Sequence, residues 1–137
     1  MRLSMKTLSV LFAFVLLSSP MAFAGKGKGG ATEKFVLKAK NAIKAAGEGD
    51  WHAQASWAKK CIEKGITTPE VNKWIEQSLK IQETAYTLEV KGDFYAKSNM
   101  KDKAIEYYMK SIQTKEVGDF TYSVKTVQEK IMKLKRS

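Results

Sequence analysis

The sequence is poor in the residues that most often carry chemistry or form cross-links. It has one cysteine, Cys61, and one histidine, His52, among 137 residues. A single cysteine excludes an intramolecular disulfide, and no C-x-x-C-H pattern is present for covalent haem attachment. Because His52 is the only histidine, no Ser-His or Cys-His arrangement can be built around a second one, and the sequence gives no sign of three zinc ligands.

We therefore expect no enzyme, no metal site and no cofactor. A carboxylate pair for glycoside cleavage is the one enzymatic alternative that the sequence leaves open. Cys61 falls among apolar positions and is predicted to be a buried, inert thiol, with an intermolecular disulfide as the alternative. The tryptophans are expected to pack between helices, with stacking on sugar rings as the alternative; they are Trp51, Trp57 and Trp74.

The first 24 residues have the pattern of a secretory signal peptide. Arg2 and Lys6 give a positive start, an apolar run covers residues 8–17, and residues 22–24 form an A-x-A cleavage motif. The apolar run is shorter than the roughly 20 residues that a membrane-spanning helix needs. We expect cleavage after Ala24, a periplasmic or secreted protein, and no membrane span afterwards. An uncleaved membrane anchor is the alternative.

Acidic residues are in deficit in the expected mature chain. The leader contains two of the 24 basic residues and none of the 14 acidic ones, so 22 basic and 14 acidic residues remain, a net charge of +8. Such a surface favours acidic proteins, anionic envelope polymers or lipid head groups, and export argues against nucleic acid. A solvated lysine-rich surface is the plain alternative. Residues 25–31 are predicted to be a flexible Gly/Lys linker, and residues 32–137 a single helical domain.

Proline is nearly absent from the mature chain, where only Pro69 occurs. Apolar residues recur at intervals of three and four, which is the helical period, and no strand pattern follows Ala31. The fold class is therefore all-α. The spacing predicts about five helices: Thr32–Ala46, Trp51–Lys64, a long helix opened by Thr68 and Pro69 that runs past Gly92 to a turn at Asn99 and Met100, Asp102–Lys115, and Phe120–Lys135 after a stop at Gly118-Asp119. Three i,i+4 pairs support these helices: Glu76–Lys80, Glu106–Lys110 and Glu129–Lys133.

Small and aromatic residues stand at fixed intervals around the stretch GDFYAKSNMKDKAIEYYMKSIQ, residues 92–113. The spaced residues are Leu88, Gly92, Tyr95, Ala104, Tyr108 and Ser111. This set resembles the signature of the tetratricopeptide repeat over residues 85–118. It departs from the family pattern at Glu116, where proline is usual.

The resemblance implies antiparallel helical hairpins stacked in a right-handed superhelix. Gly92 and Ala104 would be small because two helices cross closely there, and the aromatic residues would fill the space on either side. Residues 47–65 look like a second, degenerate unit in which Gly49-Asp50-Trp51 resembles the repeat turn. Its small-residue position would be Ala53 or Gln54.

The resemblance also implies a protein-binding groove lined by the first helix of each pair. The family's groove positions transfer to Tyr86, Glu89, Asp93 and Lys97, expected to be an exposed stripe; a solvated helix face is the alternative. We therefore expect an exported periplasmic adaptor or scaffold that binds a protein or peptide within a cell-envelope assembly. One alternative is a basic helical binder of anionic envelope polymer or lipid. The other is a structural subunit that self-associates through its exposed repeat faces.

Overall fold

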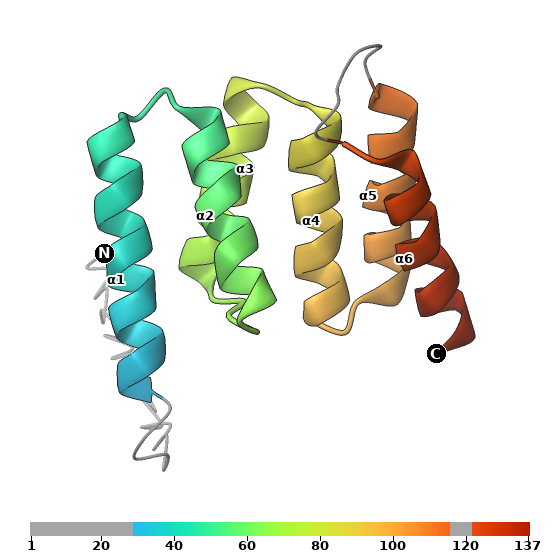
Figure 1. Ribbon diagram of the computed structural model, residues 1–137, viewed down its shortest axis with the longest axis horizontal. Coiled ribbons are helices and arrows are strands. Elements are labelled where there is room, and N and C mark those ends of the chain that lie inside the picture. Colours follow the sequence, from blue (N-terminus) through green and yellow to red (C-terminus); the bar gives the residue numbers. More distant parts are fainter. Residues whose placement is uncertain (1–28, 116–121) are drawn as a thin grey trace, which may run out of the picture.

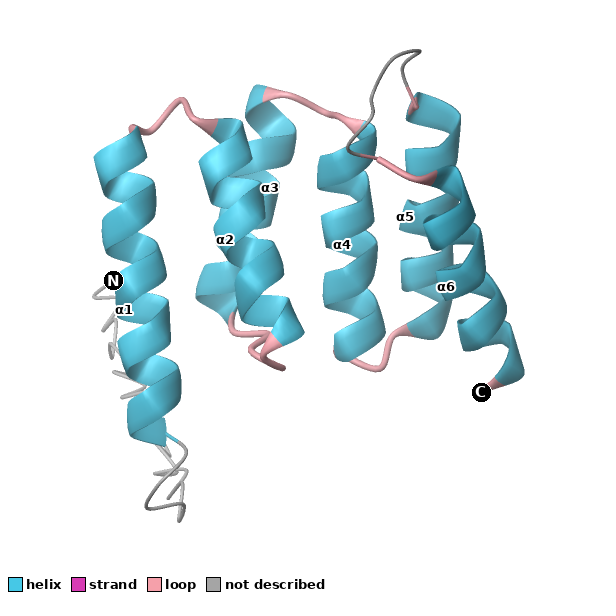
Figure 2. Cartoon of the chain, in the orientation of Figure 1, coloured by secondary structure: helices cyan, strands magenta, loops and turns pink. Residues whose placement is uncertain are grey.

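The computed structural model describes residues 29–115 and 122–137, and every regular element in these residues is an α-helix (Figure 1, Figure 2). The all-α prediction is confirmed. The predicted signal peptide, residues 25–28 of the linker, Glu116 and the Gly118-Asp119 stop lie outside the described residues. The helices are α1 (Gly29–Ala46), α2 (Trp51–Glu63), α3 (Pro69–Ile81), α4 (Ala85–Lys97), α5 (Lys101–Thr114) and α6 (Val124–Arg136).

The helices form two antiparallel hairpins that stand side by side, with a single helix at each end. The first hairpin pairs α2 with α3, and the second pairs α4 with α5; α2 also contacts α4, α1 contacts α2, and α6 contacts α5. In the view of Figure 1, α2, α4 and α6 form a front row, and α3 and α5 lie behind it. The handedness predicted for a superhelix of such hairpins stays a prediction.

The two hairpins bury side chains at corresponding positions. The start of α4 at Ala85 follows the start of α2 at Trp51 by the length of one tetratricopeptide unit. Three buried residues of α5 likewise have buried counterparts almost one unit length earlier, in α3. The pairs are Leu88 with Gln54, Gly92 with Ala58, Ala104 with Val71, Tyr108 with Ile75, and Ser111 with Ser78.

This correspondence changes the predicted register of the first unit. The close-packed small residue is Ala58, and neither Ala53 nor Gln54 takes that position. The Gly49-Asp50-Trp51 segment connects α1 to α2, and these two helices contact each other. Asp50 acts there as an N-cap, since its side chain accepts a hydrogen bond from the backbone N–H of Ala53 at 2.8 Å.

The predicted long third helix is wrong, because α3 ends at Ile81 and α4 begins at Ala85. A capping box starts α4. The Thr84 hydroxyl accepts from the backbone N–H of Thr87 at 3.1 Å, and the Thr87 hydroxyl accepts from the backbone N–H of Thr84 at 2.9 Å. Apolar spacing continues in phase across this break, and no glycine or proline marks it. The chain therefore has six helices in its described residues instead of about five.

Two further boundaries differ from the prediction. The first helix begins at Gly29, so residues 29–31 of the predicted linker are helical. The last helix begins at Val124, with Ser123 as its cap and a hydrogen bond from the Thr126 N–H to the Ser123 hydroxyl at 3.3 Å. Short polar side chains that accept hydrogen bonds from free N–H groups thus fix the starts of α2, α4 and α6.

The buried side chains form two clusters. The N-terminal cluster joins α1, α2, α3 and one residue of α4: Ala39, Ile43, Ala58, Cys61, Ile62, Ile66, Val71, Trp74, Ile75 and Val90. The C-terminal cluster joins α4, α5 and α6: Ala85, Ala104, Tyr108, Tyr122, Val127 and Ile131.

The buried-thiol prediction is confirmed, since Cys61 is fully buried and burial raises its pKa. Trp74 packs in the core as expected, and Trp57 packs against Phe35 with ring centroids 6.1 Å apart.

The close crossing predicted at Gly92 is confirmed. A Cβ atom placed on Gly92 would lie 2.5 Å from the Cδ1 and Cε1 atoms of the Tyr108 ring, closer than real Cβ contacts come. Ala104 on the facing helix is also fully buried. Any larger side chain at either position would force α4 and α5 apart.

Candidate functional site

The stripe predicted as a groove on α4 is divided between two environments. Lys97 is exposed and Tyr86 is half-buried, but Glu89 retains only 6% of its surface and is buried. The expectation of an exposed stripe therefore holds only for Lys97; it is wrong for Glu89, and Tyr86 and Asp93 are half-buried. The reason is α6, whose presence beside α4 follows from packing that the repeat spacing did not reveal.

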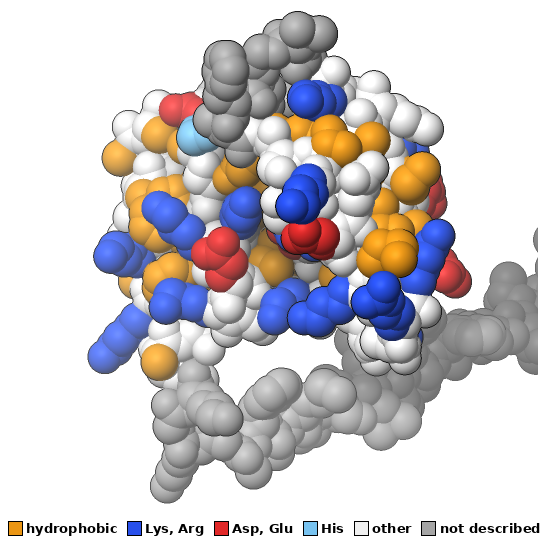
Figure 3. Space-filling model, turned by 45° about the vertical axis from the view of Figure 1, so that its right-hand side comes forward, with side chains coloured by type: hydrophobic (Ala, Val, Ile, Leu, Met, Phe, Trp, Pro, Cys, Tyr) orange, Lys and Arg blue, Asp and Glu red, His pale blue; other side chains and the backbone are white. Residues whose placement is uncertain are grey.

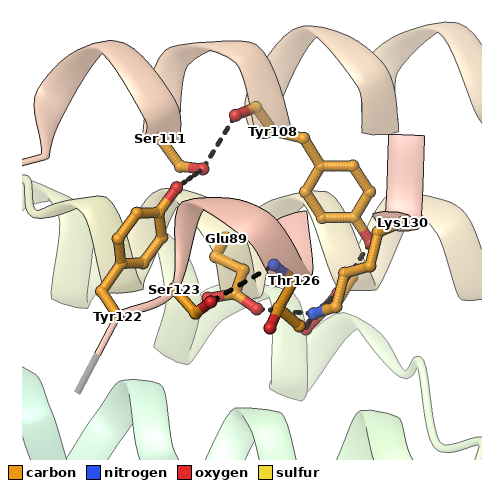
Figure 4. A network of polar contacts seen from close by, with 8 residues as sticks. Glu89, Tyr108, Ser111, Tyr122, Ser123, Thr126 and Lys130 are labelled. Atoms are coloured by element: carbon orange, nitrogen blue, oxygen red, sulfur yellow. Dashed lines mark hydrogen bonds and ion pairs between the residues drawn. The ribbon is translucent and has the colours of Figure 1, made fainter. Parts of the chain in front are cut away.

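Lys130 of α6 lies against Glu89 of the stripe (Figure 4) and also pairs with Asp93. Its Nζ donates to Glu89 Oε1 at 2.6 Å and to Asp93 Oδ1 at 2.7 Å. Burial alone would lower the pKa of Lys130, but the charge of Asp93 and the hydrogen bonds to both carboxylates outweigh burial and raise it. These carboxylates therefore hold α6 in place and are not free to bind a partner.

Two tyrosines extend this polar network into the C-terminal cluster. The Tyr108 hydroxyl donates to Asp93 Oδ1 at 2.7 Å, and the hydroxyls of Ser111 and Tyr122 lie 2.7 Å apart. Burial, followed by the negative charge of Asp93, raises the pKa of Tyr108. Ser111 also donates to the Tyr108 carbonyl at 2.8 Å, so one chain of hydrogen bonds links α5 to the segment that leads into α6.

Tyr86, the remaining large residue of the predicted stripe, faces α2. Its ring stacks on the His52 ring with centroids 5.7 Å apart, and Lys59 Nζ lies 5.2 Å from its centroid. Its hydroxyl donates a long hydrogen bond of 3.5 Å to Ser56 Oγ. We call these four residues, His52, Ser56, Lys59 and Tyr86, the aromatic patch.

Sequence reasoning found Tyr86 but missed its neighbours on α2. The signal was present, because His52 precedes Tyr86 by one tetratricopeptide unit length and so occupies the same place in the first unit. The expected register of the first unit, with Ala53 or Gln54 as its small residue, did not align His52 with Tyr86. Ser56 Oγ lies 3.5 Å from His52 Nδ1 on an exposed surface, and the other ring neighbours of His52 are Trp51 and Tyr86.

A hollow lies between α1 and α3, with a volume of about 510 Å³. Apolar side chains line it together with charged ones. They are Lys40, Ile43, Lys44, Glu48, Gln54, Glu70, Trp74, Gln77, Lys80 and Ile81. Gln54 donates to the Glu48 carbonyl at 2.9 Å, but its Oε1 has no hydrogen-bond partner among the described residues and is itself inaccessible. Sequence reasoning did not find this hollow.

The C-terminal end of the molecule presents a basic surface on α6. Figure 3, which brings α6 and its neighbours forward, shows lysine and arginine side chains interleaved with exposed hydrophobic ones. On α6 a shallow hollow of about 490 Å³ is lined by Lys125, Gln128, Glu129, Met132, Lys133 and Arg136.

Within residues 29–115 and 122–137, no group of histidine, cysteine and carboxylate side chains is placed to hold a metal ion. None of the helices described in these residues combines the length and apolar character that crossing a bilayer requires.

Comparison of the chain with protein-family models, with curated proteins and with solved structures finds no match. The resemblance to tetratricopeptide repeats accordingly rests on this chain's own spacing and packing. All six signature residues of the second hairpin lie in or beside the crossing of α4 and α5.

Proposed function

We propose that this protein is an exported, tetratricopeptide-like adaptor that binds another protein through its front row of helices. The observation that carries the proposal is the repeated hairpin, in which two units bury corresponding positions and stack side by side. Stacked helical hairpins leave the first helix of each pair on a shared surface, and such surfaces bind partners.

The aromatic patch is the part of this surface best suited to anchor a partner. Tyr86 is half-buried and held in place by stacking on His52, so little side-chain freedom remains to be lost on binding. Lys59 adds a positive charge beside the ring. Tyrosine anchors bordered by polar groups are typical of residues that dominate protein interfaces.

The proposal is tested by affinity capture. The chain is expressed with its leader, purified after export, immobilised and exposed to an envelope extract. We expect one protein to be retained at high salt. Its affinity should fall by roughly thirtyfold or more for His52→Ala combined with Tyr86→Ala, which corresponds to about 2 kcal/mol for an aromatic anchor.

Tyr107→Ala is the matched control, because Tyr107 is also half-buried but lies on α5, in the back row. Thermal unfolding of each variant separates lost binding from lost folding. Retention of the partner by the folded aromatic-patch variant at full affinity would rule out this surface.

The compartment is a separate part of the proposal. The A-x-A motif at residues 22–24 supports cleavage after Ala24. Intact-mass measurement of the exported protein should show a chain that begins at Gly25. A retained leader would instead support a membrane-anchored protein.

A basic binder of anionic polymer or lipid is the second candidate, supported by the net charge of +8 and the basic side chains of α6. Capture that disappears steeply with rising salt would favour this candidate over the adaptor. The third candidate, self-association, is supported by Leu37, exposed on the terminal helix α1. It predicts a mass that rises with protein concentration in analytical ultracentrifugation.

A further inference from the structure

The helix α6 occupies the place of a third first-row helix. Three α4 positions have counterparts at one constant interval further along the chain, in α6: Leu88 with Val127, Gly92 with Ile131, and Tyr95 with Leu134. The members of each pair match in burial, the first two pairs being buried and the third half-buried. This interval exceeds one tetratricopeptide unit length because the connection between α5 and α6 is longer, which is why the repeat spacing did not point to α6.

The predicted stripe on α4 has counterparts on α6 at the same interval. Residues Tyr86, Glu89, Asp93 and Lys97 correspond to Lys125, Gln128, Met132 and Arg136, which we call the α6 stripe. All four residues of the α6 stripe line the shallow hollow on this helix. On α4 the middle of the stripe is covered by Lys130, whereas all four residues of the α6 stripe are exposed.

The side chains around the hollow on α6 are mostly basic. Lys125, Lys133 and Arg136 surround the hollow, and Glu129 is the only carboxylate among the described residues that line it. No ion pair within the described residues engages any of these cations. Met132 is 49% exposed at the centre, where its flexible thioether can adapt to an apolar group.

We infer that the α6 stripe binds an acidic peptide segment that carries an apolar side chain. The segment would place carboxylates against Lys125 and Arg136 and its apolar group on Met132, while Gln128 can hydrogen-bond to its backbone. Glu129 disfavours a uniformly anionic polymer or lipid surface, because such a partner would bring a negative charge against it. This inference rests on the proposed protein-binding function and adds the chemistry of the partner.

The same geometry limits the cations of α6 that could bind an anionic polymer or lipid. Lys130 is engaged with Glu89 and Asp93 and is only 29% exposed, so it is not available to an external anion. The cations of α6 that remain available are those that border Met132. Binding to them should depend on charge and on the methionine together.

The experiment selects ligands from a random peptide library displayed on phage, using the full exported protein. We expect the enriched peptides to combine Asp or Glu with an aliphatic or aromatic residue. Synthetic copies are then measured by fluorescence anisotropy. Lys125→Glu combined with Lys133→Glu should weaken binding about tenfold or more, and Met132→Ser should weaken it severalfold.

The charge-matched control is Lys73→Glu combined with Lys101→Glu, two exposed lysines outside the hollow. We expect this variant to bind nearly as the parent does. Equal losses in both double variants would mean that net charge alone attracts the peptides and would overturn the inference. Failure to enrich acidic peptides would also overturn it.

Two further outcomes separate this inference from the proposed function. Peptides that lose affinity for the aromatic-patch variant but not for the α6 variant would support the proposed function and overturn the α6 site. Vesicles of phosphatidylglycerol are the second probe. Binding to these vesicles that needs the α6 cations but not Met132 would identify an anionic lipid surface in place of a peptide.

Discussion

The two buried clusters stabilise their helices by different means. The N-terminal cluster consists of aliphatic side chains, Trp74 and the Cys61 thiol, and its packing requires no polar partner. The C-terminal cluster includes two tyrosines, Tyr108 and Tyr122, and is bordered by Lys130 with its two carboxylates. The first is therefore held by apolar burial, and the second by apolar burial combined with a defined polar network.

This difference explains how α6 acquires a single position. Apolar burial has no directional requirement, but a buried polar network is fully satisfied in only one arrangement of the helices. Lys130 finds both Glu89 and Asp93 in that arrangement, and Tyr108 bonds to the same Asp93. The polar network thus fixes the orientation of α6, on which the α6 stripe depends.

A buried lysine lies where the two regions meet. Lys91 of α4 is 1% exposed and donates to Asn72 at 2.6 Å and to Glu76, both on α3. Its carboxylate partner is 55% exposed, unlike Glu89. Lys91, which is buried, and Lys130, which is half-buried, therefore offer a comparison of two paired cations whose carboxylate partners differ in access to water.

The largest loss of stability is expected from Lys130→Met. Removing the cation leaves Glu89 buried and Asp93 nearly so, without a counter-charge, and stranded buried charges cost about 3–5 kcal/mol. Urea unfolding at pH 7 measures the loss. Lys91→Met is the comparison and should cost less than about 1 kcal/mol, because Glu76 can be hydrated once its partner is gone. Equal losses would remove the distinction between the two networks.

The next largest loss of stability is expected from Gly92→Ala, which should lower the free energy of unfolding by about 1–3 kcal/mol. The added methyl would lie 2.5 Å from the Tyr108 ring, which cannot turn aside without breaking its hydrogen bond to Asp93. The thermal midpoint should fall accordingly. Gly49→Ala is the control, since a Cβ there meets no atom within 4 Å. An unchanged midpoint for Gly92→Ala would contradict the close crossing of α4 and α5.

Alkaline pH should destabilise the C-terminal region. The pKa values of Lys130 and Tyr108 are both raised, so above about pH 10 the unfolded chain loses protons that the folded chain keeps. Stability should then fall with rising pH, by at most about 1.4 kcal/mol per pH unit for each group. Urea unfolding across the alkaline range measures the slope. Tyr108→Phe should make the slope shallower, and an identical slope would exclude Tyr108 as a contributor.

The smallest difference is expected between two helix caps. Thr84→Ala removes the hydroxyl that caps α4 and should cost about 1 kcal/mol. Thr68 stands at the same position before α3, but its side chain makes no cap bond, and its hydroxyl has no hydrogen-bond partner in residues 29–115 and 122–137. Thr68→Ala should therefore be nearly neutral. Denaturant midpoints that fall equally in both variants would show that the α4 cap has no special role.

Much of the second hairpin could be predicted from the sequence. Gly92, Ala104 and Tyr108 have sizes that fit only a close crossing of two helices, and their spacing is local. The start of the preceding helix was missed because the apolar period runs through residues 82–84 unbroken. The signal there was a hydrogen-bonding pair, Thr84 with Thr87, which hydrophobic spacing does not register.

The predicted i,i+4 ion pairs show the same limit. Glu106 and Lys110 pair at 2.8 Å as expected, and Glu106 has a lowered pKa, chiefly through the hydrogen bond from Lys110. Glu76 pairs with Lys91 of another helix instead of with Lys80. Glu129–Lys133 is not among the ion pairs of the described residues. Local spacing makes a pair available, but a nearby helix can offer a better partner.

The sequence by itself determined that the chain is helical, where α4 and α5 cross, and that the single cysteine lies on the apolar face of its helix. Each of these follows from interactions within a helix or across one short turn, where residue spacing fixes geometry. Only the tertiary structure decided that Lys130, far from Glu89 in the sequence, lies 2.6 Å from it in space. It alone separated the covered stripe of α4 from the open stripe of α6, because burial depends on which helix packs against which, and spacing along one helix does not contain that information.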